Sequence, residues 1–417
     1  MSHIIFHIDV NSAYLSWTAV EQLKNGADVD IRTIPAIIGG DRESRHGIVL
    51  AKSPSAKKFG IRTGEPVVNA FRKCPNLHMD PPNHRMYREY SRRLMDFLKT
   101  YTPEIEQVSV DECYMDFTGI AQRFSSPVEA AYEIKARVYE KFGFTVNVGI
   151  STNKLLAKMA SDFEKPNRVH TLFPEEVKEK MWPLPISNLF MAGNSSVETL
   201  RKLEIQTIGD LAKADPKLIE LHLKSHGRRL WEFANGMDDS IVESEKAEAK
   251  GVGNSTTLSK DVSTKEDAQK VLLSLAQSVG GRLRKHGYHA GVVNVEIKYA
   301  DFTVNSHQKQ LERMTASDQV IYQTAVELFC EMWNGKPIRL LGIRTSKLSQ
   351  EGEPQQLSLF DLNFHSSDNI SEEVKSFENS QKHEKLDQAL DEIRKKFGKD
   401  AVVRASFLKK PEKEEKM

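Results

Sequence analysis

A short apolar strand that ends in a carboxylate constrains the fold of this chain more than any other segment. Residues 4–10, with the sequence IIFHIDV, are mostly apolar and rich in β-branched side chains, and the run is too short for a typical helix. This pattern predicts a buried strand. Asp9 stands at its end, so the sequence predicts a sheet that presents a charged side chain where this strand stops.

A second pair of acids stands in a similar setting. Residues 105–110 predict a strand, Asp111 and Glu112 a turn, and the following CYMDF another strand, which places the two acids at the tip of a hairpin-like arrangement. Helical spacing of apolar residues predicts helices over residues 12–24, 87–101, 127–142 and 153–163, and alternation predicts a strand over 145–150. A β-rich core with helices on one face is typical of a ferredoxin-like palm, so we expect an α/β (α+β) fold.

The remaining regions differ in composition. Residues 27–71 are strand-like and basic, with a short helical piece, SAKKFG, inside them. Residues 174–241 predict short helices, 243–250 a charged linker and 251–348 a second mixed α/β region. The segment 349–383 is polar apart from one apolar island, QLSLF, and its part from 363 to 383 is expected to be disordered. Residues 386–397 have helical spacing, and AVVRASF after them predicts a strand.

The bulk composition excludes some classes of protein. The formal net charge of +1 over 417 residues does not indicate a polyanionic partner, so a nucleic-acid site must be a local patch. The three cysteines, Cys74, Cys113 and Cys330, form no CxxC pair, which excludes a disulfide framework and suits a reducing cytosol. No stretch approaches the ~18 apolar residues of a membrane span. We therefore expect a multidomain protein in the cytoplasm, without a membrane partner.

The three strand-end acids suggest a chemistry. Nucleotidyl transfer uses two Mg²⁺ ions to clamp the attacking hydroxyl, the α-phosphate and the departing pyrophosphate. Mg²⁺ prefers hard oxygen ligands and uses few protein carboxylates. Acids on adjacent strands of a rigid sheet suit this task, although either motif alone is more often a solvated turn.

Five segments together resemble the Y family of DNA polymerases. In chain order they are HIDVNSAY, AKKFGIRTG, SVDECYMDF, VGISTNKLLAKMASDFEKPN and PIRLLGIRTSKL. The resemblance, closest to the bacterial polymerase IV and UmuC-like branch, implies error-prone translesion DNA synthesis without proofreading. It also implies a right-hand fold with a palm over 1–18 and 72–170, fingers over 19–71, a thumb over 171–242 and a little finger over 251–348.

The resemblance assigns the catalytic and metal-binding roles to four residues. Asp9, Asp111 and Glu112 match the family's metal ligands, and the carbonyl of Val10 matches a further one. The implied cofactor is Mg²⁺, as two ions. The implied substrates are a primer-template DNA and deoxynucleoside triphosphates.

Other residues match the nucleotide site of the family. Lys165 and Lys57 match residues that hold the triphosphate, although an arginine is usual at Lys57, and a lysine lacks the bidentate fork. Pro54 stands where a tyrosine usually bonds the phosphates, so that contact is missing or supplied elsewhere. Tyr14, five residues after Asp9, matches the steric gate that rejects a 2′-hydroxyl.

DNA contacts are expected in the thumb and the little finger. The thumb segment LFMAGNSSVETL resembles a helix-hairpin-helix, but Met191 replaces its first glycine and only Gly193 remains, so a structural turn is an almost equal alternative. In the little finger, basic side chains suit DNA phosphates without reading the base sequence, and the candidates are Arg282, Arg284, Arg339 and Arg344.

The apolar island in the polar segment resembles the bacterial sliding-clamp peptide QLxLF. Its expected clamp-binding residues are Gln356, Leu357, Leu359 and Phe360. Tethering to the clamp's beta subunit raises the effective concentration of a weak, monomeric polymerase at the primer end. A strand packed on the little finger is the alternative for this peptide, and residues 384–417 form a tail to which the sequence assigns no role.

Two other functions compete with a polymerase. A catalytically dispensable adaptor that binds DNA and the clamp would lack metal ligands, whereas all three acids are present. A nucleotidyl cyclase has a similar palm, but the thumb, the little finger and the clamp peptide argue against it. Primer extension on a defined template separates all three possibilities.

Overall fold

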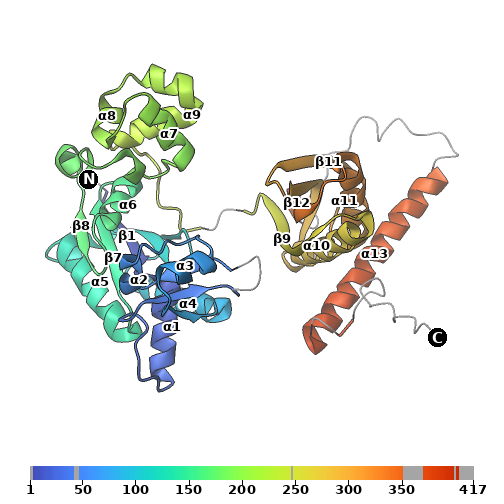
Figure 1. Ribbon diagram of the computed structural model, residues 1–417, viewed down its shortest axis with the longest axis horizontal. Helices are drawn as coiled ribbons and strands as arrows, with labels where there is room; N and C mark the ends of the chain where they lie inside the picture. The colour runs from blue at the N-terminus through green and yellow to red at the C-terminus, as the bar shows by residue number, and fades with distance from the viewer. Residues whose placement is uncertain (1–2, 42–46, 246–247, 351–369, 399–400, 403–417) are drawn as a thin grey trace. The chain divides into compact units, whose positions relative to one another are not determined.

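The computed structural model describes residues 3–41, 47–245, 248–350, 370–398 and 401–402 (Figure 1). The chain forms two compact units, Met1–Lys246 and Ala247–Met417. The break between them falls inside the charged segment 243–250. The finer division into palm, fingers, thumb and little finger stays a prediction.

A five-stranded sheet forms the centre of the first unit. The strand order is β5-β6-β1-β7-β8, and β1 pairs antiparallel with both β6 and β7. The strands β1, β5, β6 and β7, with the helices between them, follow the β-α-β-β-α-β connectivity of a ferredoxin-like fold. The expected mixed α/β fold is therefore confirmed. The bounds are β1 Ile5–Val10, β5 Ile105–Gln107, β6 Glu112–Asp116, β7 Val146–Ser151 and β8 Val169–Thr171.

Helices cover both faces of this sheet, so the expectation that they lie on one face is wrong. The even residues of β1, Phe6, Ile8 and Val10, pack into the main core with α1 (Ala13–Lys24), α4 (His84–Leu98) and α5 (Pro127–Phe142). Ile5 instead packs with Tyr114 and with Ala157 of α6 (Lys154–Asp162). Because successive side chains of a strand point to opposite faces, His7 and Asp9 share the α6 face with Ile5.

A glycine lets α6 approach the sheet closely. A Cβ atom at Gly149 of β7 would lie 2.0 Å from the carbonyl oxygen of Ala157 and 2.4 Å from the backbone nitrogen of Ser161. No side chain fits in that space, so any larger residue would push α6 away. The approach brings the polar residues of α6 beside the ends of β1 and β6.

Two smaller cores complete the first unit. Residues 36–80 form a three-stranded sheet with two helices, one of which was missed by the strand-like interpretation of residues 27–71. Residues 174–234 form a bundle of short helices that shares its core with α6. The elements of the first are β2 Ala36–Gly39, β3 Val49–Lys52, β4 His78–Asp80, α2 Pro54–Lys58 and α3 Val67–Lys73. The helices of the second are η2 Pro174–Glu176, η3 Val177–Met181, η4 Ile186–Asn188, α7 Asn194–Lys202, α8 Ile208–Lys213 and α9 Pro216–Ala234. One further short helix, η1 Thr118–Arg123, belongs to the central sheet region.

The second unit is a four-stranded antiparallel sheet covered by two helices. The strand order is β11-β10-β12-β9, and apolar residues of alternate positions in β10 and β12 form its core with the helices. Its elements are β9 Gly251–Val262, α10 Lys265–Lys285, β10 Tyr288–Tyr299, β11 Val304–Thr315, α11 Asp318–Met332 and β12 Ile338–Gln350.

A C-terminal helix, α13 (Ile370–Phe397), belongs to this second unit (Figure 1). The expectation of disorder up to residue 383 is wrong for residues 370–383, because α13 begins at Ile370, sixteen residues before the apolar spacing that starts at Leu386. Its contacts explain the order: Glu384 accepts hydrogen bonds from Thr315 and the Ala316 backbone, and Asp387 accepts one from the Asp318 backbone. These carboxylates cap the first turn of α11 from another part of the chain. The strand predicted at AVVRASF lies outside the described residues after Val402.

None of the described helices has the length and apolar character needed to cross a lipid bilayer.

Candidate active site

The three predicted acids lie together at the end of the central sheet. Asp9 of β1 stands directly opposite Glu112 of β6 in the antiparallel ladder, and the Val10 backbone N–H donates to the Asp111 carbonyl at 3.0 Å. Directly opposed residues project from the same face of a sheet, so Asp9 and Glu112 both point toward α6. Register thus brings together acids that are a hundred residues apart in the sequence.

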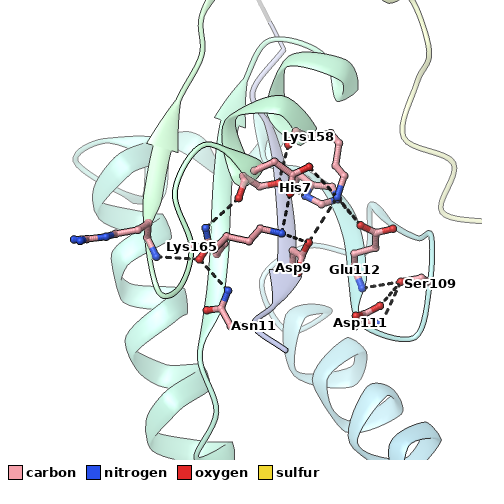
Figure 2. Close-up of polar contacts among 12 residues, drawn as sticks. His7, Asp9, Asn11, Ser109, Asp111, Glu112, Lys158 and Lys165 are labelled. Carbon is pink, nitrogen blue, oxygen red and sulfur yellow. Dashed lines mark hydrogen bonds and ion pairs between the residues drawn. The ribbon is translucent and has the colours of Figure 1, made fainter. Parts of the chain in front are cut away.

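Ser109 fixes the turn that carries Asp111. Its hydroxyl donates to the Asp111 carboxylate at 2.6 Å and accepts from the backbone N–H groups of Asp111 and Glu112, each at 3.2 Å (Figure 2). Burial, and then the charges of Asp9 and Glu112, raise the pKa of Asp111. The turn therefore holds a carboxylate in a place where a cation would stabilise its charged form.

Two lysines balance the acids. Lys165 Nζ lies 2.7 Å from Asp9 and 2.8 Å from Asp162, and Lys158 Nζ lies 2.8 Å from Glu112 and 3.6 Å from Asp9 (Figure 2). Burial alone would lower the pKa of each lysine, but the surrounding carboxylates outweigh it and the pKa values are raised. Both ammonium groups are therefore charged at neutral pH.

The sequence interpretation included Lys165 but missed Lys158 and Asp162. In the sequence, Lys158, Asp162 and Lys165 are four and three residues apart, which is the spacing of residues on one face of a helix. This spacing was the one available signal that the three side chains lie together. Such spacing is equally typical of a solvated helix surface. Only the packing of α6 on β1 and β6 shows that this face meets the acids.

A polar network holds the loop that carries Lys165. The Asn11 amide donates to Asn147 at 3.0 Å, and its oxygen accepts from the Asn167 backbone N–H at 2.8 Å. Asn147 in turn donates to the carbonyls of Ser161 and Glu164. Asn11 thus has a structural task, since it joins the end of β1 to the loop of Lys165.

Tyr14 stands beside the acids on the first turn of α1. Its ring stacks on Tyr87 with centroids 4.3 Å apart and an 8° interplanar angle, and His84 meets it edge-on. Burial, followed by the charge of Asp111, raises the pKa of its hydroxyl. The stacked ring has a fixed orientation, as a steric gate requires.

Lys57 and Pro54 lie on α2, and both are exposed. Ser53 caps this helix and Pro54 takes its first position, where a missing N–H costs nothing. Lys52 on β3 is close enough to Lys57 for the two charges to interact, and burial and then Lys57 lower the pKa of Lys52. These two cations therefore share one small surface.

The expected DNA contacts in the second unit differ in their exposure. Arg344 and Arg282 are exposed, and Arg282 donates to the Gly253 carbonyl at 3.0 Å. The Arg339 guanidinium lies 4.8 Å from the ring centre of the exposed Phe302. The expectation for Arg284 is corrected: its side chain is 7% exposed and pairs with Asp318, Asp387 and Asp391, so it is not available to a phosphate.

Two further expectations have different outcomes. Met191 in the thumb hairpin has a left-handed backbone, φ 66°, which is the conformation that a glycine usually adopts. The turn thus has at Met191 a backbone conformation that favours glycine, and the helix-hairpin-helix stays a prediction. The clamp-peptide residues Gln356, Leu357, Leu359 and Phe360 lie outside the described residues.

Comparisons with known proteins agree with this arrangement. A family model described as the impB/mucB/samB family matches residues 8–162, and the model of its C-terminal domain matches residues 249–359. DNA polymerase IV of Clostridium acetobutylicum is 47% identical over 413 residues, with 99% of this chain and 100% of that protein covered. DNA polymerase IV 1 of Bacillus subtilis is 36% identical over 417 residues, with 100% and 95% covered.

A solved structure has the same fold. A Y-family DNA polymerase chimera superposes with a TM-score of 0.72 at 24% identity, covering 83% of this chain and 99% of the chimera. The two relatives match over 95–100% of their lengths, and both family models fall in the order that the sequence motifs predict. The chain therefore belongs to the impB/mucB/samB family of Y-family polymerases and is a translesion DNA-directed DNA polymerase, which uses a DNA template and nucleotide substrates in a metal-dependent nucleotidyl transfer.

Proposed function

We propose that Asp9, Asp111 and Glu112 hold two Mg²⁺ ions, with the Val10 carbonyl as a further ligand. The observation that carries this proposal is the register of β1 and β6, which sets Asp9 opposite Glu112 with Asp111 in the adjoining turn. The donor set fits, because carboxylate and carbonyl oxygens are the ligands that Mg²⁺ prefers. When bound, the ions neutralise charge on the transferred phosphate and favour deprotonation of the attacking hydroxyl.

The side chains must rearrange to hold the ions. Among the described residues, no three His, Cys, Asp or Glu side chains converge as a ready metal site. Lys165 and Lys158 instead occupy the space beside Asp9 and Glu112. We infer that Lys165 leaves Asp9 for the incoming triphosphate, while Asp162, its second partner at 2.8 Å, limits how far it moves.

Substrate binding uses a second set of residues. We propose that Lys165 and Lys57 bind the triphosphate as point charges, since neither has the fork of an arginine. Tyr14 excludes a 2′-hydroxyl, because its ring is held on Tyr87 and cannot yield easily. Arg282, Arg339 and Arg344 bind DNA phosphates, a role that requires exposure or shallow burial and no sequence reading.

The clamp contact is proposed from the sequence of the QLSLF peptide. Gln356, Leu357, Leu359 and Phe360 match the peptide that docks in the apolar pockets of the sliding clamp. We further propose that the protein acts as a monomer in the cytoplasm, where bacterial chromosomal DNA lies. The family resemblance implies synthesis without proofreading, and we expect the same of this chain.

Primer extension with a defined template and titrated Mg²⁺ tests these assignments. We expect incorporation that requires Mg²⁺, and we expect Asp9→Asn, Asp111→Asn and Glu112→Gln each to remove it while DNA affinity is kept. If one of these variants keeps wild-type Mg²⁺ dependence, that residue is not a ligand. The adaptor alternative predicts no template-directed extension at any Mg²⁺ concentration, and the named relatives do not favour it.

A further inference from the structure

His7 is a buried polar residue that the roles above leave unused. It lies on β1 two residues before Asp9 and therefore on the same face of the sheet. Its residue is 1% exposed, with Tyr114 of β6 packed edge-on against the ring at 4.8 Å between centroids. An apolar side chain would serve packing alone at this depth, so the imidazole nitrogens require an explanation.

Each nitrogen faces a different polar group. Nδ1 lies 2.8 Å from the Ser161 hydroxyl of α6, and Nε2 lies 3.4 Å from Glu112 Oε2 (Figure 2). Within the described part of the chain, Nε2 is buried and forms no well-aligned hydrogen bond. The distance of 3.4 Å is at the long end for a hydrogen bond, but the alternative is a buried nitrogen without any partner.

One neutral tautomer is complementary to both neighbours of the ring. If the Ser161 hydroxyl donates to Nδ1, then Nε2 carries the hydrogen and points it at the Glu112 carboxylate. The Ser161 hydroxyl has one hydrogen and two acceptors within 2.8 Å, Nδ1 and the Lys158 carbonyl, and that carbonyl lies inside α6 with the helix ladder also available to it. The opposite tautomer would direct a lone pair at a carboxylate oxygen.

The contacts of Glu112 are asymmetric. Both the His7 contact and the 2.8 Å contact from Lys158 involve Oε2. Among the described residues, no hydrogen bond or ion pair is formed by Oε1 of Glu112. A carboxylate gripped by one oxygen keeps a fixed orientation and leaves the other oxygen for a cation, as second-layer partners do at other metal centres.

We propose that His7 is a positioning residue for Glu112, with Ser161 setting its tautomer and thereby the orientation of the carboxylate toward the catalytic cation. This inference rests on the proposed role of Glu112 as a metal ligand. It adds a residue that does not touch the substrate or the metal. Its place on the buried face of β1 means that it acts only through Glu112.

Two substitutions at His7 test the contacts of its two ring nitrogens one at a time. His7→Gln keeps a donor near the position of Nε2 and loses the Nδ1 contact, whereas His7→Asn keeps a group near Nδ1 and presents nothing to Glu112. We expect His7→Asn to raise the Mg²⁺ concentration for half-maximal extension by on the order of tenfold, the low end for loss of such a partner. We expect His7→Gln to change it less than about threefold, within the spread of such effects.

A second readout does not depend on turnover. Mn²⁺ binding to the complex with a dideoxy-terminated primer and an incoming nucleotide, followed by electron paramagnetic resonance, should weaken in His7→Asn and not in His7→Gln. His170→Asn is the matched control, because His170 is also a histidine of the first unit whose Nε2 is buried without a partner. It should leave Mn²⁺ binding unchanged, and all three variants should keep wild-type DNA affinity.

The outcomes are distinct. Equal Mn²⁺ affinity in His7→Asn and wild type would overturn the positioning role, and so would an equal loss in all three variants, which indicates a general packing defect. Should the His7 variants fail to fold, Ser161→Ala tests the same tautomer, and an unchanged Mg²⁺ requirement there overturns it. If Glu112→Gln itself leaves Mn²⁺ binding unaltered, the proposed metal role fails instead.

Discussion

Two clusters of three carboxylates stand in the two units of this molecule. In the first, Asp9, Asp111 and Glu112 are partly exposed, and Asp9 and Glu112 pair with the flexible ammonium groups of Lys158 and Lys165. In the second, Asp318, Asp387 and Asp391 surround the planar guanidinium of Arg284, and Asp318 and Asp387 are 2% and 3% exposed at their side chains. The same residue types thus appear in an open and in a closed arrangement.

The difference lies in what else satisfies the carboxylates. In the second unit, Asp387 accepts the Asp318 backbone N–H at 2.9 Å, Glu384 accepts the Ala316 N–H at 3.1 Å, and Arg284 donates to the Ala316 carbonyl at 2.7 Å. Backbone groups and the rigid guanidinium of Arg284 therefore satisfy the carboxylates of this cluster. In the first unit the partners are lysine side chains, which can move away when a ligand arrives. The open cluster suits catalysis, and the closed one holds α13 on the rest of the second unit.

The largest expected effect tests the open cluster. Asp111→Ala should reduce primer extension by on the order of a thousandfold or more, because it removes a charge that the metal-dependent reaction needs. DNA binding, measured by fluorescence anisotropy, should be nearly unchanged. Asp116→Asn, at the far end of β6 opposite Ile5, is the control and should extend primers normally. Residual extension by Asp111→Ala within tenfold of wild type would contradict the assignment.

Breaking the closed cluster should cost stability and not chemistry. Arg284→Met leaves two buried carboxylates, Asp318 and Asp387, and the partly exposed Asp391 without their cation, and breaking a buried pair in this way typically costs about 3–5 kcal/mol. We expect amide hydrogen exchange in the first turn of α11 and in α13 to accelerate strongly. Arg282→Met, two residues away and exposed, is the control. Equal exchange in the two variants would mean that α13 is not held by Arg284.

The next prediction returns to the open site. Tyr14→Ala should reduce discrimination against ribonucleotides by about 100-fold, since relief of a steric clash of ~3 kcal/mol corresponds to two powers of ten. Tyr14→Phe should keep the discrimination, because the ring and not the hydroxyl stacks on Tyr87. Single-nucleotide insertion kinetics with paired ribo- and deoxynucleotides measure the ratio. An unchanged ratio in Tyr14→Ala would identify Tyr14 as a packing residue.

A smaller effect concerns the peptide between β12 and α13. Leu359→Ala with Phe360→Ala should leave extension on short naked primers unchanged and should remove the gain seen when a bacterial clamp is loaded. A free peptide of this kind should bind with a Kd on the order of micromolar, so the loss should be large only where tethering matters. If clamp stimulation survives, the little finger or the tail after residue 363 makes the main contact.

The smallest expected effect is a pH dependence of the closed cluster. Burial raises the pKa of Asp318 to about 6, with Asp387 adding to the rise and Arg284 opposing it. An acid whose folded pKa exceeds its unfolded value of ~3.9 binds its proton more tightly in the folded state, so stability rises as pH falls through about 6. Glu384 opposes this at lower pH, because its pKa is lowered despite burial, through His289 and the Ala316 N–H.

The stability of the cluster should therefore rise as pH falls from about 6 and should be greatest near pH 4.5, below which the contribution of Glu384 is lost. Thermal unfolding of the full chain across this range, followed through exchange in α11, measures the rise. Asp318→Asn should flatten it, because the amide does not titrate, and Lys270→Gln on the exposed face of α10 should not. A rise of the same size in Asp318→Asn would assign the dependence to another group.

The sequence alone determined the features that repeat along a single element. The apolar run of β1, the hairpin of β5 and β6, and α5 at residues 127–142 follow from local periodicity, and the structure confirms them. Asp9, Asp111 and Glu112 were found for the same reason, since each interrupts or ends such a run. Local preferences are expressed within one element and need no partner.

Only the tertiary structure decided which faces meet. His7 looked like part of a buried strand because its two polar partners, Glu112 and Ser161, come from elements 105 and 154 positions away. From the sequence, Arg284 was interpreted as a DNA contact, and the role of α13 was not recognised. Both have the same cause: the acids that pair with this arginine lie on three separate turns of two other helices, α11 and α13. Periodicity shows that a residue lies on a given face of its own element. The identity of the group opposite depends on register and helix packing, and these are set by the whole core and by no single segment.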